Sequence, residues 1–143
     1  MISAYLGRKQ GGYMSMDVVK VSDFPSGAAA IQRPIEILES GGLVVFPTET
    51  VYGLAARADC PAAMDRLRQA KSRGPRDAFT VHIGSPSDVR LYASNLSALA
   101  ARFVRKGWPG PLTLIVDAAA SPERGLDEMT VNAICYNGTV GLR

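Results

Sequence analysis

The residues best suited to chemistry lie in two loop segments that are rich in hydroxyl groups and cations. Thr48-Glu49-Thr50-Val51-Tyr52 follows the apolar run Leu43–Phe46, and ligands in sheet proteins commonly bind just beyond strand ends, where loops present hydroxyls and backbone N–H groups. Lys71-Ser72-Arg73-Gly74-Pro75-Arg76-Asp77 places three cations within six residues, and arginine and lysine suit phosphate oxygens. The first segment therefore suits a bound ligand, and the second suits a polyphosphate. The structural alternatives are a plain β-hairpin at the first segment and, at the second, solvated cations after a helix C-terminus.

Two expected strands add further candidates. His82 is the single histidine, and the alternation of Phe79–Ile83 places it on the face opposite the apolar side chains. In the terminal run, Thr139, Gly141 and Arg143 share one face, where the glycine leaves room for a ligand and the arginine suits a carboxylate. A satisfied structural histidine and an ordinary strand end are the alternatives at these positions.

Other features are interpreted as structural. The Trp108-Pro109-Gly110-Pro111 turn pins the entry to a strand, with Trp108 packed over it. Cys60 and Cys135 are far apart, and with one histidine they supply no zinc site of the usual composition. We therefore predict two buried thiols and no protein-bound metal.

The hydrophobic pattern and the turn residues predict the elements that position these candidates. In the first part of the chain we expect an edge strand at Asp17–Ser22, a helix within 27–40 that Pro34 starts or kinks and Gly41-Gly42 ends, the buried strand Leu43–Phe46, and a helix from Pro61 with Ala63, Met64, Leu67 and Ala70 on its apolar face. In the second part we expect the strand Phe79–Ile83, a short helix at Ser85-Pro86, a helix lined by Leu96, Leu99, Ala100 and Phe103, the strand Leu112–Val116, a polar loop over 121–125, and the strands Met129–Ala133 and Thr139–Arg143 with Asn137-Gly138 as a possible hairpin turn. Strands and helices mix without strict alternation, which favours an α/β (α+β) fold with an open, twisted sheet of mixed direction flanked by helices.

Composition places the chain among globular proteins. Its 143 residues suit one domain, 47% of them are hydrophobic, and the net charge of +3 suits a nucleotide ligand while leaving RNA open. No apolar run approaches the roughly 20 residues that span a bilayer, and the start lacks the pattern of a signal peptide. We expect a cytoplasmic protein without membrane contact, in which residues 1–16 form a flexible leader and residues 17–143 form the domain.

Taken together, several segments resemble the YrdC family. They occur in the family's order and with similar spacing over roughly residues 27–143, and the Pro-Thr-Glu-Thr and Trp-Pro-Gly-Pro segments are the most specific pair. The matching stretches are Gly41–Leu54, Lys71-Ser72-Arg73, Val81-His82-Ile83, Trp108–Leu114 and Thr139–Arg143.

The resemblance implies a YrdC-like fold and an L-threonylcarbamoyladenylate (threonylcarbamoyl-AMP) synthase. Such a nucleotidyltransferase joins L-threonine, bicarbonate and ATP, releases pyrophosphate, and serves the modification of adenosine next to the anticodon of certain tRNAs. Mg²⁺ is expected with ATP, held through phosphate and water. No catalytic side chain is assigned, because attack of a carbamate on the α-phosphorus depends on positioning and charge neutralisation. By position, the resemblance implies Thr50, His82 and Arg143 as threonine-binding residues, Lys71, Arg73, Asp77 and Thr139 as nucleotide-binding residues, and Thr48, Tyr52 and Thr113 as further candidates for the pocket.

The sequence departs from the family's pattern at several positions. Gly74 replaces a proline, Ala78-Phe79 replaces Pro-Leu, Ala55 stands where glycine is frequent, and Asp77 adds a negative charge near the phosphates. The family's Ser-x-Asn segment, which follows the strand ending at Arg143, is not among these residues, so we expect an incomplete pocket, an exposed sheet edge and self-association. Two other functions stay open: a non-catalytic module that binds nucleotides, tRNA or double-stranded RNA, and a relative that handles a carbamoyl-adenylate without threonine.

Overall fold

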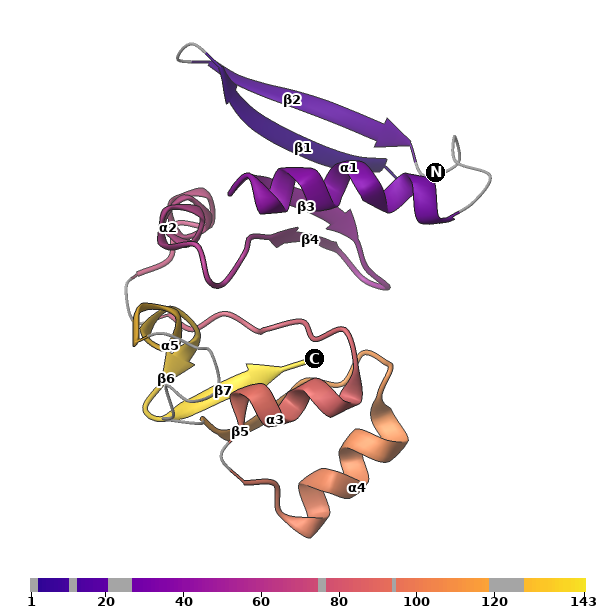
Figure 1. Ribbon diagram of the computed structural model, residues 1–143, viewed down its shortest axis with the longest axis vertical. Helices are drawn as coiled ribbons and strands as arrows, with labels where there is room; N and C mark the ends of the chain where they lie inside the picture. Colours follow the sequence, from indigo (N-terminus) through magenta and orange to yellow (C-terminus); the bar gives the residue numbers. More distant parts are fainter. Residues whose placement is uncertain (1–2, 11–12, 21–26, 75–76, 94, 119–127) are drawn as a thin grey trace. The chain divides into compact units, whose positions relative to one another are not determined.

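The chain divides into two compact units, Met1–Arg73 and Gly74–Arg143, and each is described by itself. The computed structural model describes residues 3–10, 13–20, 27–74, 77–93, 95–118 and 128–143 (Figure 1). No helix within these ranges is long and apolar enough to cross a membrane.

The first unit is built on a four-stranded antiparallel sheet with the order β2-β1-β3-β4. Its strands are β1 (Ser3–Gln10), β2 (Tyr13–Lys20), β3 (Leu43–Pro47) and β4 (Tyr52–Ala55). Helix α1 (Gly27–Glu39) lies alongside this sheet (Figure 1). Ile37 of α1 packs with Val44 of β3 in a buried cluster, and the partly buried Leu38 packs against them. The apolar face of α1 therefore covers the strand that leads to the Thr48–Tyr52 segment.

Two glycines set the C-terminal end of α1. Gly41 has φ 74°, and the N–H groups of Gly41 and Gly42 bond to the carbonyls of Leu38 and Ile37 at 2.9 and 2.7 Å. This is the glycine-terminated helix end expected from the sequence. Pro34 lies inside α1 and does not start it.

Helix α2 (Pro61–Ala70) follows Cys60 at its N-cap and has proline in its first turn. Ala63, Met64 and Leu67 form its buried face, as predicted, whereas Ala70 is exposed.

The second unit contains a three-stranded antiparallel sheet with the order β5-β7-β6. Its strands are β5 (Leu114–Asp117), β6 (Cys135–Tyr136) and β7 (Thr139–Leu142), and Val140 and Leu142 of β7 are almost completely buried. Asn137 and Gly138 join β6 to β7 with φ 49° and 76°, which makes the predicted two-residue hairpin turn of the type that requires positive φ at both positions. The helical elements are η2 (Pro86–Asp88), α3 (Val89–Tyr92), α4 (Ala98–Gly107) and α5 (Glu128–Ile134).

The α/β class is confirmed, but the sheet differs in detail from the expected one. The named strands pair antiparallel in two separate sheets, and a parallel contact joins Val81 to Leu142. The predicted strand Phe79–Ile83 is therefore an extended segment that forms one bridge to β7, and three backbone hydrogen bonds join it to residues 141–143.

Residues 1–16, expected as a flexible leader, contribute to two strands where the structure describes them. β1 pairs with β2 along its whole length and with β3 at Tyr5–Gly7. The pairing of β1 with β3 joins segments distant in sequence, and the glycines within residues 1–16 hid the strands from local pattern analysis. The predicted edge strand at 17–22 corresponds to the end of β2, which does lie at a sheet edge, while residues 21 and 22 lie outside the described ranges.

Two predictions about the second unit are also wrong. Residues 129–133 form part of helix α5, and its buried Thr130 (3% exposed) and Ile134 (1% exposed) are four residues apart, which is helical spacing. Leu99 and Phe103, expected to line the core, are 60% and 48% exposed on α4, whereas Val104 is buried. The position of the helix was predicted correctly, but its buried face was not.

The predicted polar loop over 121–125 lies outside the described residues.

Candidate functional site

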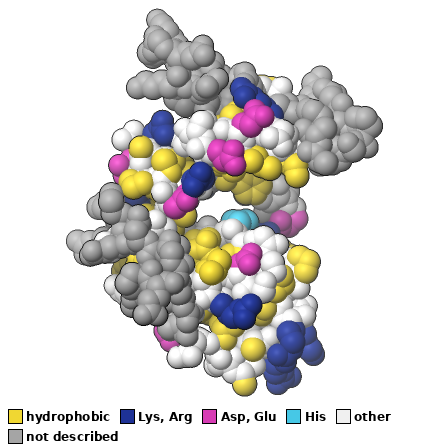
Figure 2. Space-filling model, in the orientation of Figure 1, with side chains coloured by type: hydrophobic (Ala, Val, Ile, Leu, Met, Phe, Trp, Pro, Cys, Tyr) yellow, Lys and Arg dark blue, Asp and Glu magenta, His cyan; other side chains and the backbone are white. Residues whose placement is uncertain are grey.

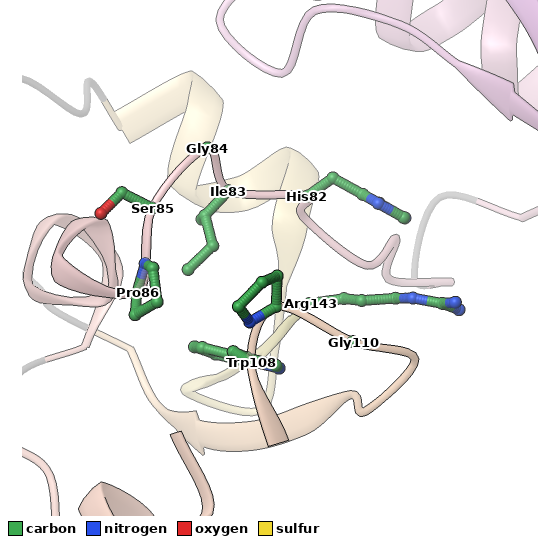
Figure 3. Close-up of a pocket in the computed structure, with 9 residues that line it drawn as sticks. His82, Ile83, Gly84, Ser85, Pro86, Trp108, Gly110 and Arg143 are labelled. Atoms are coloured by element: carbon green, nitrogen blue, oxygen red, sulfur yellow. The ribbon is translucent and has the colours of Figure 1, made fainter. Parts of the chain in front are cut away.

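A pocket of about 200 Å³ lies within the second unit (Figure 3). Three segments supply its walls: the extended run after Val81, the turn after α4, and the residue that follows β7. The lining residues are His82, Ile83, Gly84, Ser85, Pro86, Trp108, Pro109, Gly110 and Arg143.

Backbone pairing brings His82 and Arg143 together. The N–H groups of Val81 and Ile83 bond to the carbonyls of Gly141 and Arg143 at 2.8 and 3.0 Å, and the N–H of Arg143 bonds to the carbonyl of Val81 at 2.9 Å. Val81 is buried, so the alternation of an extended chain directs His82 away from the core. Figure 3 shows the side chains of His82 and Arg143 extending in the same direction.

The environment favours a neutral His82. Partial burial, followed by the positive charge of Arg143, lowers the pKa of the imidazole below its ordinary value of 6.5. Figure 2 shows that the histidine, coloured cyan, still reaches the surface. The pocket therefore combines a permanently charged guanidinium, which suits a carboxylate or phosphate, with an uncharged imidazole that has one donor and one acceptor nitrogen.

The turn after α4 forms a wall that the sequence analysis treated as purely structural. The indole of Trp108 donates from Nε1 to the carbonyl of Leu112 at 2.7 Å, and the Trp108–Pro109 peptide bond is cis. Trp108, Pro109 and Gly110 all line the pocket. The signal available in the sequence was a rigid Pro-Gly-Pro turn beside an aromatic residue, which describes a wall as well as a strand entry.

Ser85 is a second lining residue that sequence reasoning missed. Its hydroxyl accepts from the N–H of Ser87 at 3.2 Å, and the Asp88 carboxylate accepts from the N–H of Ser85 at 2.9 Å. This capping box starts η2 and holds the Gly84–Pro86 side of the pocket.

Thr139 and Thr113 belong to the same unit but are absent from the described lining of the pocket. The Thr139 hydroxyl donates to the carbonyl of Tyr136 at 2.8 Å and supports the hairpin. A Cβ built on Gly141 would lie 3.7 Å from Thr113 Cγ2 and from Thr80 Oγ1. Thr80 and Thr113 therefore border Gly141, where ordinary contacts would accommodate a small side chain.

The first candidate segment forms the turn between β3 and β4, so the hairpin alternative is correct for its backbone. The Thr48 hydroxyl accepts from the N–H groups of Thr50 and Val51 at 3.3 and 3.1 Å and donates to the carbonyl of Val51. Thr48 thus organises the turn. Thr50 is exposed beside it, with its hydroxyl 3.4 Å from that of Thr48, and Tyr52 is exposed at the start of β4.

The cationic segment follows a second tight helix end. Ser72 has φ 50°, its N–H bonds to the carbonyl of Gln69 at 3.1 Å, and the N–H of Arg73 bonds to the carbonyl of Arg68 at 2.9 Å. This pair of hydrogen bonds is the Schellman motif, here with serine at the left-handed position that glycine usually occupies. It sets the backbone at Lys71 and Arg73, both exposed.

Asp77 has a structural partner. One of its carboxylate oxygens accepts from the N–H of Gly74 at 2.9 Å, and its own N–H bonds to the Gly74 carbonyl at 3.1 Å. The carboxylate therefore closes a turn, which accounts for an acidic residue beside the cations. Pro75 and Arg76 lie outside the described residues.

The predicted residues thus form groups within each unit. His82 and Arg143 line one pocket, with Asp77, Thr113 and Thr139 elsewhere in the second unit. Thr48, Thr50 and Tyr52 occupy one turn of the first unit, and Lys71 and Arg73 follow its last helix.

Comparison with known proteins gives the family. Residues 36–143 match the Sua5/YciO/YrdC family model, which carries the description "Telomere recombination". The threonylcarbamoyl-AMP synthase of Pyrococcus abyssi is 37% identical over 98 residues, which are 66% of this chain and 29% of that protein. That of Psychromonas ingrahamii is 36% identical over 84 residues, which are 57% of this chain and 44% of that protein.

A solved structure agrees with these relatives. The crystal structure of P. abyssi Sua5 complexed with L-threonine superposes with a TM-score of 0.67 at 30% identity, over 80% of this chain and 32% of that one. The chain spans less than half the length of each of these proteins. Since the family model covers well over half of the present sequence, the chain belongs to the Sua5/YciO/YrdC family.

Proposed function

We propose that the chain carries out, or contributes a substrate-binding part of, threonylcarbamoyl-AMP synthesis from L-threonine, bicarbonate and ATP. The named relatives and the threonine-bound structural neighbour support this proposal. The product would serve adenosine modification in tRNA, in the cytoplasm, and the reaction class would be nucleotidyl transfer.

The observation that carries the proposal is the pairing of Arg143 with a neutral His82 in a small pocket. A guanidinium offers two parallel N–H donors to a carboxylate. The cavity of about 200 Å³ is smaller than the roughly 300–1,000 Å³ typical of sites for drug-sized ligands. It therefore suits an amino acid better than a whole nucleotide.

In the proposed reaction these groups position the reactants. Arg143 would hold the threonine carboxylate, and His82, which lines the same pocket, would contact the rest of the amino acid. Carboxylation of the amine by bicarbonate releases water and gives a carbamate, one oxygen of which attacks the α-phosphorus of ATP and expels pyrophosphate. Positioning and charge neutralisation suffice for such a transfer.

Phosphates of the nucleotide would be bound by the cations Lys71 and Arg73. Mg²⁺ prefers oxygen ligands and retains water. Among the predicted nucleotide-binding residues, Thr139 offers a hydroxyl and Asp77 offers a carboxylate. Both groups already have backbone partners. We therefore propose that the metal enters with ATP and is held mainly by phosphate and water, where it would neutralise charge on the phosphates.

The single tryptophan gives a direct test, because Trp108 lines the pocket. L-Threonine should change its fluorescence in a saturable titration, and Arg143→Gln should weaken binding roughly 10–100-fold, the equivalent of a charged hydrogen bond worth ~1.5–3 kcal/mol. Arg105→Gln, on the exposed surface of α4, is the matched control. Unchanged affinity in Arg143→Gln would contradict the assignment.

Pyrophosphate release separates the proposal from its alternatives. Release from ATP that requires both threonine and bicarbonate supports synthesis. Threonine-independent turnover would favour a relative that handles another carbamoyl-adenylate. RNA binding with steep salt dependence and no turnover would favour a binding module.

A further inference from the structure

The turn after α4 is tied by one side-chain hydrogen bond. Trp108 is only 8% exposed, and its Nε1–H donates to the carbonyl of Leu112 at 2.7 Å. Pro109 and Pro111 within this turn have no N–H to donate. The indole thus joins the first residue of the turn to the last.

Two glycines show how tightly the turn closes. A Cβ on Gly110 would lie 2.4 Å from the carbonyl oxygen of Gly107, and a Cβ on Gly107 would lie 2.5 Å from Leu112 Cδ2. Real Cβ atoms essentially never approach other atoms so closely. The backbone of Gly110 is therefore folded directly against the end of α4, and the turn has no spare room.

The same turn forms one side of the pocket. Trp108, Pro109 and Gly110 line it together with the 82–86 segment and Arg143, and Figure 3 shows Trp108 and Gly110 beside Arg143. The two prolines and the tied indole have few accessible conformations, and Gly110 is packed against the end of α4, so this wall cannot yield easily to a larger ligand.

We propose that Trp108 is a positioning residue that sets the size of the pocket, and thereby selects an amino acid of threonine's bulk over longer homologues. This inference rests on the proposed function. The tied turn supplies a rigid boundary on one side of the pocket, and an extra methylene directed at this turn would meet backbone that has no room to move. Discrimination against one methylene is typically about 10–200-fold in a fitted site.

The test compares L-threonine with β-hydroxynorvaline, which is threonine lengthened by one methylene and retains the hydroxyl. Dissociation constants are measured by calorimetry for the 143-residue chain and for Trp108→Phe, which keeps an aromatic ring and removes the N–H donor. We expect the unmodified chain to prefer threonine by about tenfold or more, and Trp108→Phe to reduce this preference at least ~3-fold.

Ile134→Val is the matched control for stability. Ile134 is almost fully buried in the same unit and is absent from the described lining of the pocket. It should lower the melting temperature without changing the preference between the two amino acids. An unchanged preference in Trp108→Phe, or an equal loss in Ile134→Val, would overturn the proposal.

A second readout does not depend on threonine binding. Loss of the indole donor should accelerate amide hydrogen exchange at Gly110 and Leu112 in Trp108→Phe and leave it unchanged in Ile134→Val. If the chain binds no threonine, the proposed function fails, whereas unchanged exchange at Gly110 refutes the positioning role by itself. If Trp108→Phe does not fold, replacing the single tryptophan with β-(3-benzothienyl)alanine removes only the N–H, and the same two outcomes decide.

Discussion

Replacing Gly53 with alanine tests how the β3–β4 hairpin presents its turn. An ideal Cβ at this position would lie 2.5, 2.8 and 3.0 Å from the Cζ, Cε1 and Cε2 atoms of Phe46, which is the residue paired with Gly53 across the hairpin. Carbon atoms in contact normally stand ~3.5–4.0 Å apart. The ring must therefore move by about 1 Å, or the strands must separate.

Two opposing effects set the expected change in the free energy of local unfolding. Alanine in a strand is favoured over glycine by ~0.5–1 kcal/mol, because glycine loses more conformational freedom on folding. Overpacking costs ~1–3 kcal/mol. Since the steric effect is the larger one, we expect Gly53→Ala to lower the local stability of the hairpin by ~1–2 kcal/mol.

Amide hydrogen exchange in β3 and β4 measures this local free energy. Phe46→Leu removes the ring and, with Phe46→Leu/Gly53→Ala, completes a double-mutant cycle. In the Phe46→Leu background, Gly53→Ala should be neutral or stabilising by up to ~1 kcal/mol. Equal costs in the two backgrounds would refute the steric reasoning, because the clash would then not involve the Phe46 ring.

Four further predictions concern single positions. Ser72→Gly should raise the free energy of unfolding by about 1 kcal/mol, because a left-handed serine costs ~1–2 kcal/mol and the entropy of glycine offsets part of the gain; an unchanged urea midpoint would count against it. Gly138→Ala should lower stability by about 1 kcal/mol, since Gly138 has φ 76° and no atom lies within 4 Å of the added Cβ, so backbone strain alone acts; an unaltered melting temperature would contradict this. Arg143→Gln should raise the pKa of His82 toward 6.5 without reaching it, because burial remains after the charge is removed, and an NMR titration of the single imidazole measures the change. The lowered pKa means that the unfolded chain protonates His82 more readily than the folded chain, so the contribution of His82 to stability is lost as pH falls from about 6.5 toward the lower folded pKa. His82→Gln should flatten this pH dependence of the free energy of unfolding. An unchanged pH profile of stability in His82→Gln would contradict the prediction.

Local chemistry made several features predictable from the residues alone. Gly41-Gly42 ends α1, Cys60-Pro61 starts α2, and Asn137-Gly138 turns β6 into β7. In each case the decisive atoms belong to the same few residues: a missing Cβ, a missing N–H or a tolerance of positive φ.

Features that depend on contacts distant in sequence were not predictable in this way. Residues 129–133 suit a strand by composition, yet Thr130 and Ile134 are buried on one side of a helix. Leu99 and Phe103 have the spacing of a buried face, but Val104 is the residue of α4 that enters the core. Which face of an amphipathic helix is covered depends on the elements packed against it, and propensity does not contain that information.

The candidate site shows the same division. The sequence by itself determined the family motifs, the small set of hydroxyls and cations available for chemistry, and the turns that hold them. The family resemblance implied that His82 and Arg143 bind one ligand, but only the tertiary structure shows why they share a pocket: backbone bonds join segments about sixty residues apart. The tertiary structure likewise shows that Trp108, Pro109 and Gly110, predicted as the entry to a strand, form a wall of that pocket. A cavity exists only where separate segments fold against one another.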